Sequence, residues 1–244
     1  MGTIIHSSIL SFSLFFFLSS SAQTRTPLFE IGVNGGILVY QGDLTPSAVG
    51  SFKTPRFVLG FQGSKPLTKT VAVRIDFSRG SLHGDESLYS HPEWRQQRNF
   101  AFDAKTNEIT ASLVYQPVRN IKLQPYVFAG AGISFVRISR DYSRLNREFF
   151  STETHLLEGL ETDISHSLPR RIPILPVGLG IRYPLSSRLS VSGEAAYRFM
   201  NTDYLDGFSQ SVNPDLKDHY YKFSLGMIYT FTAKAAWDCP ANRF

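Results

Sequence analysis

The chain has 244 residues, of which 42% are hydrophobic and 18% charged, and its formal net charge is +5. This composition excludes an intrinsically disordered chain and fits one large domain or two small ones. The basic residues are scattered singly, without a Lys/Arg-rich helix or an RNA-binding signature. We therefore expect no nucleic acid partner.

Residues 1–22 have the features of a secretory signal peptide. An apolar run from Ile9 to Leu18 precedes small residues that end at Ala22, where we expect cleavage. A short membrane anchor is the alternative, because no Lys or Arg precedes the run. Later in the chain, no run approaches the roughly 18 apolar residues of a transmembrane helix. The mature chain is therefore expected to be either an exported soluble protein or a membrane β-barrel.

Eight segments of the mature chain alternate apolar and polar residues, which is the period of a β-strand. The predicted strands are Phe29–Tyr40, Pro55–Ser64, Val71–Gly80, Glu108–Tyr115, Gln124–Ser139, Ile172–Tyr183, Leu189–Phe199 and Tyr220–Phe231. Pro173 and Pro176 interrupt the sixth segment and predict a bulge or a shortened strand there.

The polar faces of these segments are rich in Gly, Ser, Thr and Ala and carry isolated charges of both signs. A water-facing sheet would instead carry dense Lys and Glu, whereas a narrow barrel lumen needs small residues and paired charges. We expect an ionic network in the lumen, formed by Glu30, Arg74, Asp76, Glu108, Arg182, Glu194, Arg198 and Lys222.

The connections between the predicted strands alternate in length. Those after the second, fourth and sixth strands are short, and the others are long, the longest running from Arg140 to Arg171. Within it, residues 155–161 fit either a short helix or a folded loop, and we expect the loop. Bacterial outer-membrane barrels show this asymmetry of short periplasmic turns and long extracellular loops. The pattern therefore predicts an all-β fold, an eight-stranded antiparallel transmembrane β-barrel of up-and-down topology over residues 23–232, with both its ends on the periplasmic side.

Several short motifs, in their order and spacing, carry a family resemblance. They are "YQGDL" (40–44), "RQQRNFAF" (95–102), "PYVFAGAG" (125–132), "NTDYLDGFS" (201–209) and "CPANRF" (239–244). Together they resemble the Bacteroidota outer-membrane β-barrels of the family that includes PorG of the type IX secretion and gliding machinery. The resemblance implies an OmpA-like barrel in the cell outer membrane and, for the PorG member, association with a periplasmic ring of PorK and PorN. Gly207 departs from the family pattern, in which a second acidic residue is usual at that place.

The strand order predicts that the segments "YQGDL" and "TDYLDG" meet at the outer rim, because the eighth strand adjoins both the seventh and the first. The predicted outer-rim motif consists of Tyr40, Gly42, Asp43, Asp203, Tyr204 and Asp206. Carboxylate oxygens at this rim suit Ca²⁺. We favour the alternative that the aspartates cap turns by accepting backbone N–H groups, so the sequence predicts no metal site and no cofactor.

A lipid A-modifying hydrolase is the enzymatic alternative, with His219, Ser209 and Asp206 near the same rim. No nucleophile elbow surrounds Ser209, so we expect no catalytic residues. The residues Trp94, Arg95 and Arg98 are candidates for contacts with lipopolysaccharide phosphates. An ordinary solvated loop is the other interpretation of that segment, and outer-membrane lipid and lipopolysaccharide are the expected surroundings of the barrel.

Residues 233–244 are predicted to form a periplasmic tail. Cys239 is the only cysteine, which excludes an internal disulfide and leaves an intermolecular thiol as a candidate. We expect Trp237, Cys239 and Pro240 to contact a periplasmic partner such as PorK- or PorN-like ring proteins, with a disordered tail as the alternative. The sequence therefore predicts a non-enzymatic outer-membrane barrel that anchors or positions this ring, or else a small barrel for envelope tethering or surface binding.

Overall fold

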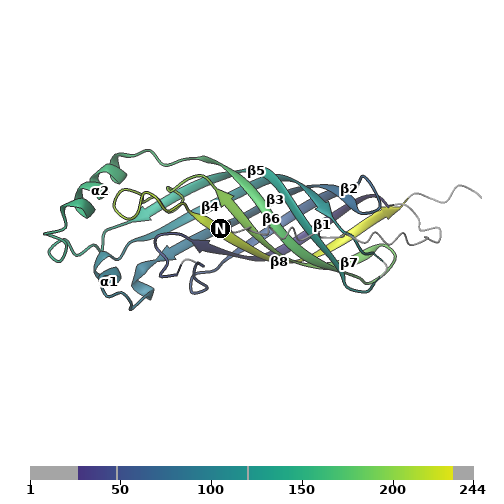
Figure 1. Ribbon diagram of the computed structural model, residues 1–244, viewed down its shortest axis with the longest axis horizontal. Helices are drawn as coiled ribbons and strands as arrows, with labels where there is room; N and C mark the ends of the chain where they lie inside the picture. Colours follow the sequence, from purple (N-terminus) through teal and green to yellow (C-terminus); the bar gives the residue numbers. More distant parts are fainter. Residues whose placement is uncertain (1–26, 48, 120, 233–244) are drawn as a thin grey trace, which may run out of the picture.

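The computed structural model describes residues 27–47, 49–119 and 121–232. Its strands form one closed antiparallel barrel in which each strand pairs with the next and β8 pairs with β1 (Figure 1). The strands are β1 (Pro27–Gln41), β2 (Arg56–Pro66), β3 (Val71–Asp85), β4 (Ala101–Tyr115), β5 (Gln124–Asp141), β6 (Arg171–Pro184), β7 (Leu189–Met200) and β8 (His219–Thr232). The predicted all-β, eight-stranded antiparallel barrel is confirmed. The predicted signal peptide and tail lie outside the described residues.

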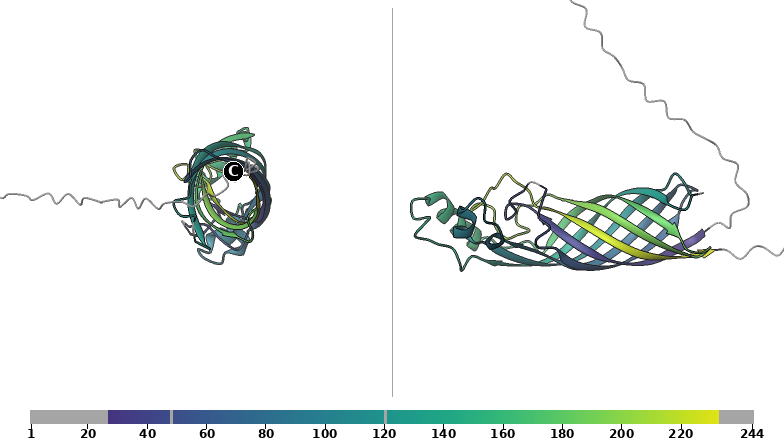
Figure 2. Two further views of the ribbon diagram at one scale, coloured as in Figure 1. Left: turned by 90° about the vertical axis from the view of Figure 1, so that its right-hand side faces the viewer. Right: turned by 90° about the horizontal axis from the view of Figure 1, so that it is seen from below.

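The two ends of the barrel differ, as Figures 1 and 2 show. At one end, called the turn end here, the turns 67–70, 116–123 and 185–188 join neighbouring strands. The first and last described strand residues, Pro27 and Thr232, pair at this same end. At the opposite end, called the loop end, the loops 42–55, 86–100, 142–170 and 201–218 make a folded mass beyond the strands.

Two α-helices and one 3₁₀ turn lie in the loops. The 3₁₀ turn η1 (Glu86–Leu88) and helix α1 (Trp94–Arg98) belong to loop 86–100, and helix α2 (Thr154–Ser165) belongs to loop 142–170. Residues 155–161, for which we expected a folded loop, are therefore helical. Neither described helix has the length and apolar character that crossing a membrane requires.

Strands β3, β4 and β5 extend beyond the predicted limits at the loop end. β3 continues from Gly80 to Asp85, and β4 begins at Ala101 rather than Glu108. In this extension the outward residues are charged, such as Asp103 and Lys105, while the inward Phe102 is buried. The predicted strands stopped where the outward apolar pattern stopped, but the ladder continues because the loops cover its inner face.

Strand β6 is continuous through both prolines, so the predicted shortening is wrong. Its ladder with β7 includes the pair Pro176–Arg198. On the other side, the ladder with β5 lacks the pairs at Gly130 and Ala131, but its register is the same before and after this gap. The predicted bulge is therefore also wrong: the missing N–H of proline interrupts the pairing without shifting the strand.

The outward face of the barrel is apolar around its whole circumference. Exposed outward side chains include Phe29, Ile31, Val33, Phe57, Leu59, Phe61, Ile75, Phe77, Ile109, Leu113, Val127, Ile133, Leu175, Val177, Leu179, Ile181, Leu225 and Met227. Exposed tyrosines at positions 115, 183 and 229 border this belt toward the turn end. The charged residues Arg79, Lys105 and Arg137 border it toward the loop end.

The interior has two zones. The zone nearer the turn end is lined by the charged residues described below. Nearer the loop end lies an apolar plug, in which strand residues such as Leu38, Leu82 and Ile174 pack against Phe100 and Phe208 from the loops. The rings of Phe100 and Phe208 stack with centroids 4.4 Å apart. The loops therefore contribute to the core of the molecule.

Candidate functional site

All eight charged residues predicted for the lumen point into the barrel, and most of them meet in three groups along its length. The group nearest the turn end pairs Glu30 of β1 with Arg182 of β6. The Arg182 guanidinium donates from Nη1 to Glu30 Oε1 at 2.9 Å and from Nη2 to Oε2 at 2.7 Å. Ser64 and Thr230 donate to the same carboxylate. This bidentate geometry is the strongest form of such a pair.

The middle group is centred on Arg74 of β3. Its guanidinium donates to Asp76 Oδ2 at 2.9 Å and to Glu194 Oε1 at 2.5 Å, and it lies 4.2 Å from the centre of the Phe128 ring. The Tyr126 hydroxyl also donates to Glu194 Oε1, at 2.7 Å. Arg74 reaches across the lumen from β3 to β7, so this group ties opposite walls of the barrel together.

The third group surrounds Glu108 of β4. The Tyr220 hydroxyl donates to Glu108 Oε1 at 2.8 Å, and Arg198 Nε lies 3.4 Å from Oε2. Lys222 is buried beside this group without a direct ion pair among the residues described, but the charges of Glu108 and Asp76 act on it. A buried charge is tolerated only when it is compensated in this way.

At the outer rim, two buried acids meet at Tyr40: Asp206 of the predicted motif and Asp218, which lies outside it. The Tyr40 hydroxyl lies 2.6 Å from Asp218 Oδ1 and 2.8 Å from Asp206 Oδ2. The other oxygens of these carboxyls accept backbone N–H groups, Asp206 Oδ1 from Phe208 and Asp218 Oδ2 from Leu205, both at 2.9 Å. Asp206 therefore caps a turn, as expected, and in addition binds Tyr40.

The Tyr40 hydroxyl has one proton and can donate to only one of these two carboxyls. The second short contact is favourable only if the other carboxyl is protonated and donates to the Tyr40 oxygen. Burial raises the pKa of both Asp206 and Asp218 well above the usual aspartate value, and the negative charges of neighbouring aspartates raise it further. The geometry and the electrostatics therefore agree that one of the two carboxyls is protonated. Asp206 and Asp218 thus share one proton between them, with the Tyr40 hydroxyl as the bridge.

The remaining members of the predicted motif lie around this pair. Gly42 has no room for a side chain, because a Cβ atom there would lie 2.0 Å from the Tyr40 hydroxyl and 2.1 Å from Asp218 Oδ1. Burial is the main cause that raises the pKa of Asp43 to about 6 and that of Asp203 to about 7. Tyr204 stacks on His166, with ring centroids 4.2 Å apart. No group of three or more potential metal ligands exists within the part of the chain that the structure describes.

Sequence reasoning missed three further buried acids that hold the loops together. Asp218 is one of them. Asp163 of α2 accepts the backbone N–H groups of Ser209, Gln210 and Ser211 at 3.0 to 3.1 Å. Glu86 accepts Arg98 through both of its oxygens and Arg95 through one. Their burial depends on loop packing, which no local pattern in the sequence encodes.

The residue set of the hydrolase alternative is not assembled. Asp206 is engaged with Tyr40, Ser209 Oγ accepts a hydrogen bond from Gln210, and His219 Nδ1 accepts the backbone N–H of Met200. No hydrogen bond among the described residues joins any two of these three. Nucleophilic hydrolysis requires such a bond between hydroxyl and base, so this geometry does not support the enzyme.

Trp94, Arg95 and Arg98 also have internal roles. The guanidinium group of Arg98 binds Glu86, and that of Arg95 binds Glu86 together with the backbone oxygens of Asp43 and Thr45. Both guanidinium groups lie near the Trp94 ring, 5.0 and 4.7 Å from its centre. The donors that would bind a lipopolysaccharide phosphate are thus largely occupied within the loop. The predicted tail contacts Trp237, Cys239 and Pro240 lie outside the described residues.

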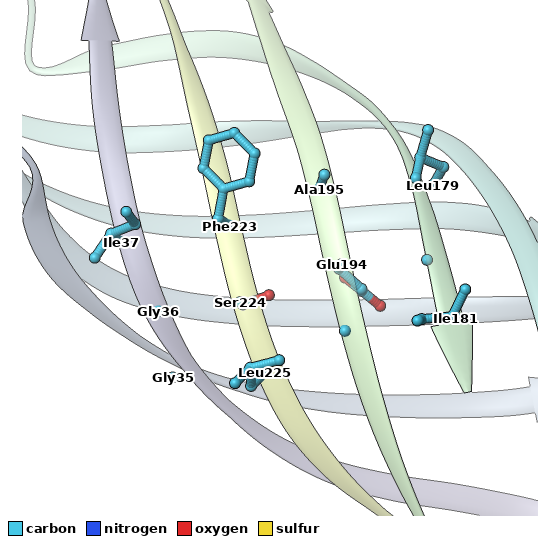
Figure 3. Close-up of a pocket in the computed structure, with 12 residues that line it drawn as sticks. Gly35, Gly36, Ile37, Leu179, Ile181, Glu194, Ala195, Phe223, Ser224 and Leu225 are labelled. Atoms are coloured by element: carbon cyan, nitrogen blue, oxygen red, sulfur yellow. The ribbon is translucent and has the colours of Figure 1, made fainter. Parts of the chain in front are cut away.

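The outward belt has a hollow of about 470 Å³ across β1, β8, β7 and β6 (Figure 3). Outward side chains such as Leu225, Phe223 and Ile181 rise beside Gly35 and Gly193, where no side chain fills the space. Added Cβ atoms at these two glycines would have only ordinary contacts, with the nearest atoms 3.5 Å away. The barrel's own packing therefore does not require glycine at either position.

Comparisons with solved structures find barrels at low sequence identity. Neisserial surface protein A (NspA) is 17% identical, with a TM-score of 0.48, over 83% of this chain and 97% of that chain. Ail, the attachment invasion locus protein of Yersinia pestis, is 14% identical, with a TM-score of 0.46, over 84% and 99%. The outer membrane protein OprG from Pseudomonas aeruginosa is 14% identical, with a TM-score of 0.44, over 85% and 98%.

No curated protein matches the chain. One family model does, over residues 9–239, which is nearly the whole length. Its description is "Domain of unknown function (DUF6089)". The chain is therefore a member of the DUF6089 family, an eight-stranded closed β-barrel.

Proposed function

We propose that this protein is a non-enzymatic integral outer-membrane β-barrel, a PorG-like component of type IX secretion that anchors or positions a periplasmic ring of PorK- and PorN-like proteins. The observation that carries the membrane location is the apolar belt that surrounds a charged interior. The secretion role is supported by the family resemblance of the motifs described above.

The belt and the closed ladder together suit a bilayer. Soluble monomers rarely expose contiguous apolar patches larger than a few hundred Å², whereas this belt covers every strand. A spanning structure must also satisfy all its backbone hydrogen bonds internally, which a barrel without edges does. The tyrosines at one border and the charged residues at the other correspond to the two membrane–water interfaces. The turn end is then periplasmic and the loop end extracellular.

The filled interior supports an anchoring role rather than transport. Ion pairs cross the lumen in the zone nearer the turn end, and the apolar plug fills the zone nearer the loop end. A barrel of eight strands has an interior just wide enough for side chains. A secreted protein would therefore cross the membrane through a different and larger channel, and the function of this barrel would lie at its two ends.

A small surface-binding barrel is the second candidate, and one observation favours it. The loop end has a pocket of about 510 Å³ whose lining includes Asp43, Trp94, Arg95 and Lys217. Asp43 Oδ2 and Arg95 Nε are buried there without hydrogen-bond partners among the described residues. Such a pocket would serve a ligand outside the cell and would need no periplasmic partner.

Isolation of the tagged full-length protein from its native envelope tests the anchoring role. We expect ring proteins to be recovered with it and to be lost or reduced when residues 233–244 are deleted. Recovery of the barrel alone from the full-length protein would refute the proposal. Undiminished recovery with the truncated chain would show that the tail, including Trp237, Cys239 and Pro240, does not contribute to docking.

A deletion strain provides the second test of the same proposal. Loss of the barrel should impair secretion of type IX substrates, and normal secretion would favour the surface-binding candidate. Replacement of Cys239 by serine separates covalent from non-covalent docking, because only a covalent contact would be lost both in this variant and after reduction of the wild type.

A further inference from the structure

The two ends of the barrel differ sharply in charge. The turns 67–70, 116–123 and 185–188 contain four Lys or Arg residues and no Asp or Glu. The four loops at the other end contain twelve Asp or Glu residues and seven Lys or Arg. The connections at the turn end are therefore net positive, whereas those at the loop end are net negative.

Basic residues of the turn end lie at the surface. Lys69, Lys122 and Arg188 are exposed, one in each turn. Neither Lys122 nor Arg188 takes part in a salt bridge among the residues that the structure describes. The nearest acid at this end, Glu30, is already bound by Arg182. Lys122 and Arg188 therefore carry positive charge that no acidic side chain among the described residues pairs with.

Arg119 shows that this charge extends over the mouth of the lumen. It is half-buried in turn 116–123, and its charge interacts with Glu30 and Arg182, which point into the barrel. Its Nε is buried and has no hydrogen-bond partner in the described part of the chain. Headgroups of the surrounding lipid would lie around the circumference, so a cation over the mouth faces the periplasmic space instead.

Each turn also exposes at least one large aliphatic side chain. Leu67, Ile121 and Leu185 are 58%, 49% and 54% exposed. Apolar contacts supply much of the affinity of protein interfaces, and charge complementarity supplies specificity and a fast association rate. The three turns present both kinds of group on one small face.

We infer that the three turns form a docking face for an acidic surface of a periplasmic protein. This inference rests on the proposed anchoring function and adds the chemistry of the partner. The ring protein that contacts the barrel would present carboxylates to Lys69, Arg119, Lys122 and Arg188. Docking through the turns is independent of docking through the tail, because the turns are fixed to the barrel wall.

Charge removal with a matched control tests the inference. The turn variant carries Lys69→Gln, Lys122→Gln and Arg188→Gln in the full-length protein, and the control variant carries Lys105→Gln, Arg137→Gln and Arg147→Gln, which are exposed residues beyond the belt at the loop end. Both variants lose the same charge. We expect recovery of the ring proteins to fall about tenfold for the turn variant and to be unchanged for the control.

Salt provides an independent measurement. Recovery by the wild type should fall between about 50 and about 500 mM NaCl, because salt screens exposed charges. The turn variant should show a much smaller dependence. If the turn variant fails to fold, which a missing heat-dependent gel shift would reveal, Lys69→Arg, Lys122→Arg and Arg188→Lys replace it. This charge-conserving set should recover the ring proteins fully.

The outcomes separate the inference from the function on which it rests. If the wild type recovers no ring protein, the proposed function fails and the inference fails with it. If the wild type recovers ring proteins and the folded turn variant recovers them equally well, the inference alone is overturned. It is also overturned if the turn variant loses only co-purifying phosphatidylglycerol, because the basic face then serves lipid phosphates.

Discussion

The Tyr40 hydroxyl lies 2.6 Å from Oδ1 of Asp218, although 178 positions separate the two residues in the chain. The same hydroxyl reaches Asp206 at 2.8 Å. One side chain at the end of β1 therefore holds loop 201–218 near both of its ends. Because that loop contributes Leu205 and Phe208 to the apolar plug, the contact couples the rim to the core.

Replacement of Tyr40 by phenylalanine removes this contact while the ring that packs on Phe102 is kept. Two buried carboxyls then lose a partner, and we expect the free energy of unfolding to fall by about 1–3 kcal/mol. Hydrogen exchange in residues 201–218 should become faster. Denaturant unfolding of the detergent-solubilised barrel and hydrogen-exchange mass spectrometry measure the two effects.

Tyr197→Phe is the matched control. Its hydroxyl also makes a hydrogen bond at the loop end, to Gln41 at 2.8 Å, but the side chain is only partly buried. We expect a clearly smaller effect. Equal effects of the two substitutions would show that the Tyr40 hydroxyl has no special role in the loop.

The shared proton predicts a pH dependence of loop 201–218. Burial raises the pKa of Asp206 and Asp218 in the folded state above the unfolded value. Over the interval between the two values the folded state binds more protons than the unfolded state, so stability falls as pH rises. The neighbouring Asp203, whose pKa burial raises to about 7, titrates in the same direction. Hydrogen exchange of the loop, corrected for intrinsic rates, should therefore increase from acidic toward alkaline pH.

Asp206→Asn tests the origin of this dependence. The asparagine amide can donate to the Tyr40 oxygen at every pH, as the protonated carboxyl does. The variant should therefore show a flatter pH profile than the wild type. Asp215→Asn, at an exposed position of the same loop, removes only a weaker charge that acts on Asp203 and should flatten the profile much less. An unaltered profile in Asp206→Asn would exclude the shared proton as the cause.

The barrel itself could be predicted from the sequence because a strand in a bilayer has two simple faces. Lipid demands apolar residues outward, and the narrow lumen demands small or paired polar residues inward. Val73 and Arg74, which alternate on β3, illustrate both demands. The positions of Arg74 and Glu194 inside the barrel follow from this alternation, although their pairing across the lumen depends on the barrel's closure and stagger.

The loop end could be predicted only in part. "YQGDL" and "TDYLDG" meet because strand order requires it, and Gly42 and Asp206 are accordingly close to Tyr40. Asp218 and Glu86 were missed because their partners come from other loops. Long-range contacts between irregular segments leave no periodic signal, and a buried carboxylate in a loop looks in the sequence like an exposed one.

Two adjacent glycines of β1 should respond differently to substitution. Gly36 faces inward, and a Cβ atom there would lie 1.9 Å from the backbone oxygen of Phe223. Gly36→Ala must displace β8, and we expect it to destabilise the barrel by about 1–3 kcal/mol. Gly35→Ala, with its nearest contact at 3.5 Å, should change the stability little. Comparison of urea midpoints checks this difference, and equal midpoints would contradict the packing described here.

The ion pair between Arg74 and Glu194 predicts the largest effect in the lumen. Glu194→Gln leaves the buried Arg74 guanidinium with Asp76 as its only remaining close carboxylate among the described residues. Removal of one partner of a buried pair typically costs about 3–5 kcal/mol, because the other charge stays buried. Asp103→Asn alters exposed contacts with Arg56 at 3.7 Å and His83 at 3.1 Å, and should cost roughly 0–1 kcal/mol. Urea unfolding of both variants measures the difference. A similar small loss in each would mean that water, rather than Glu194, compensates the charge of Arg74.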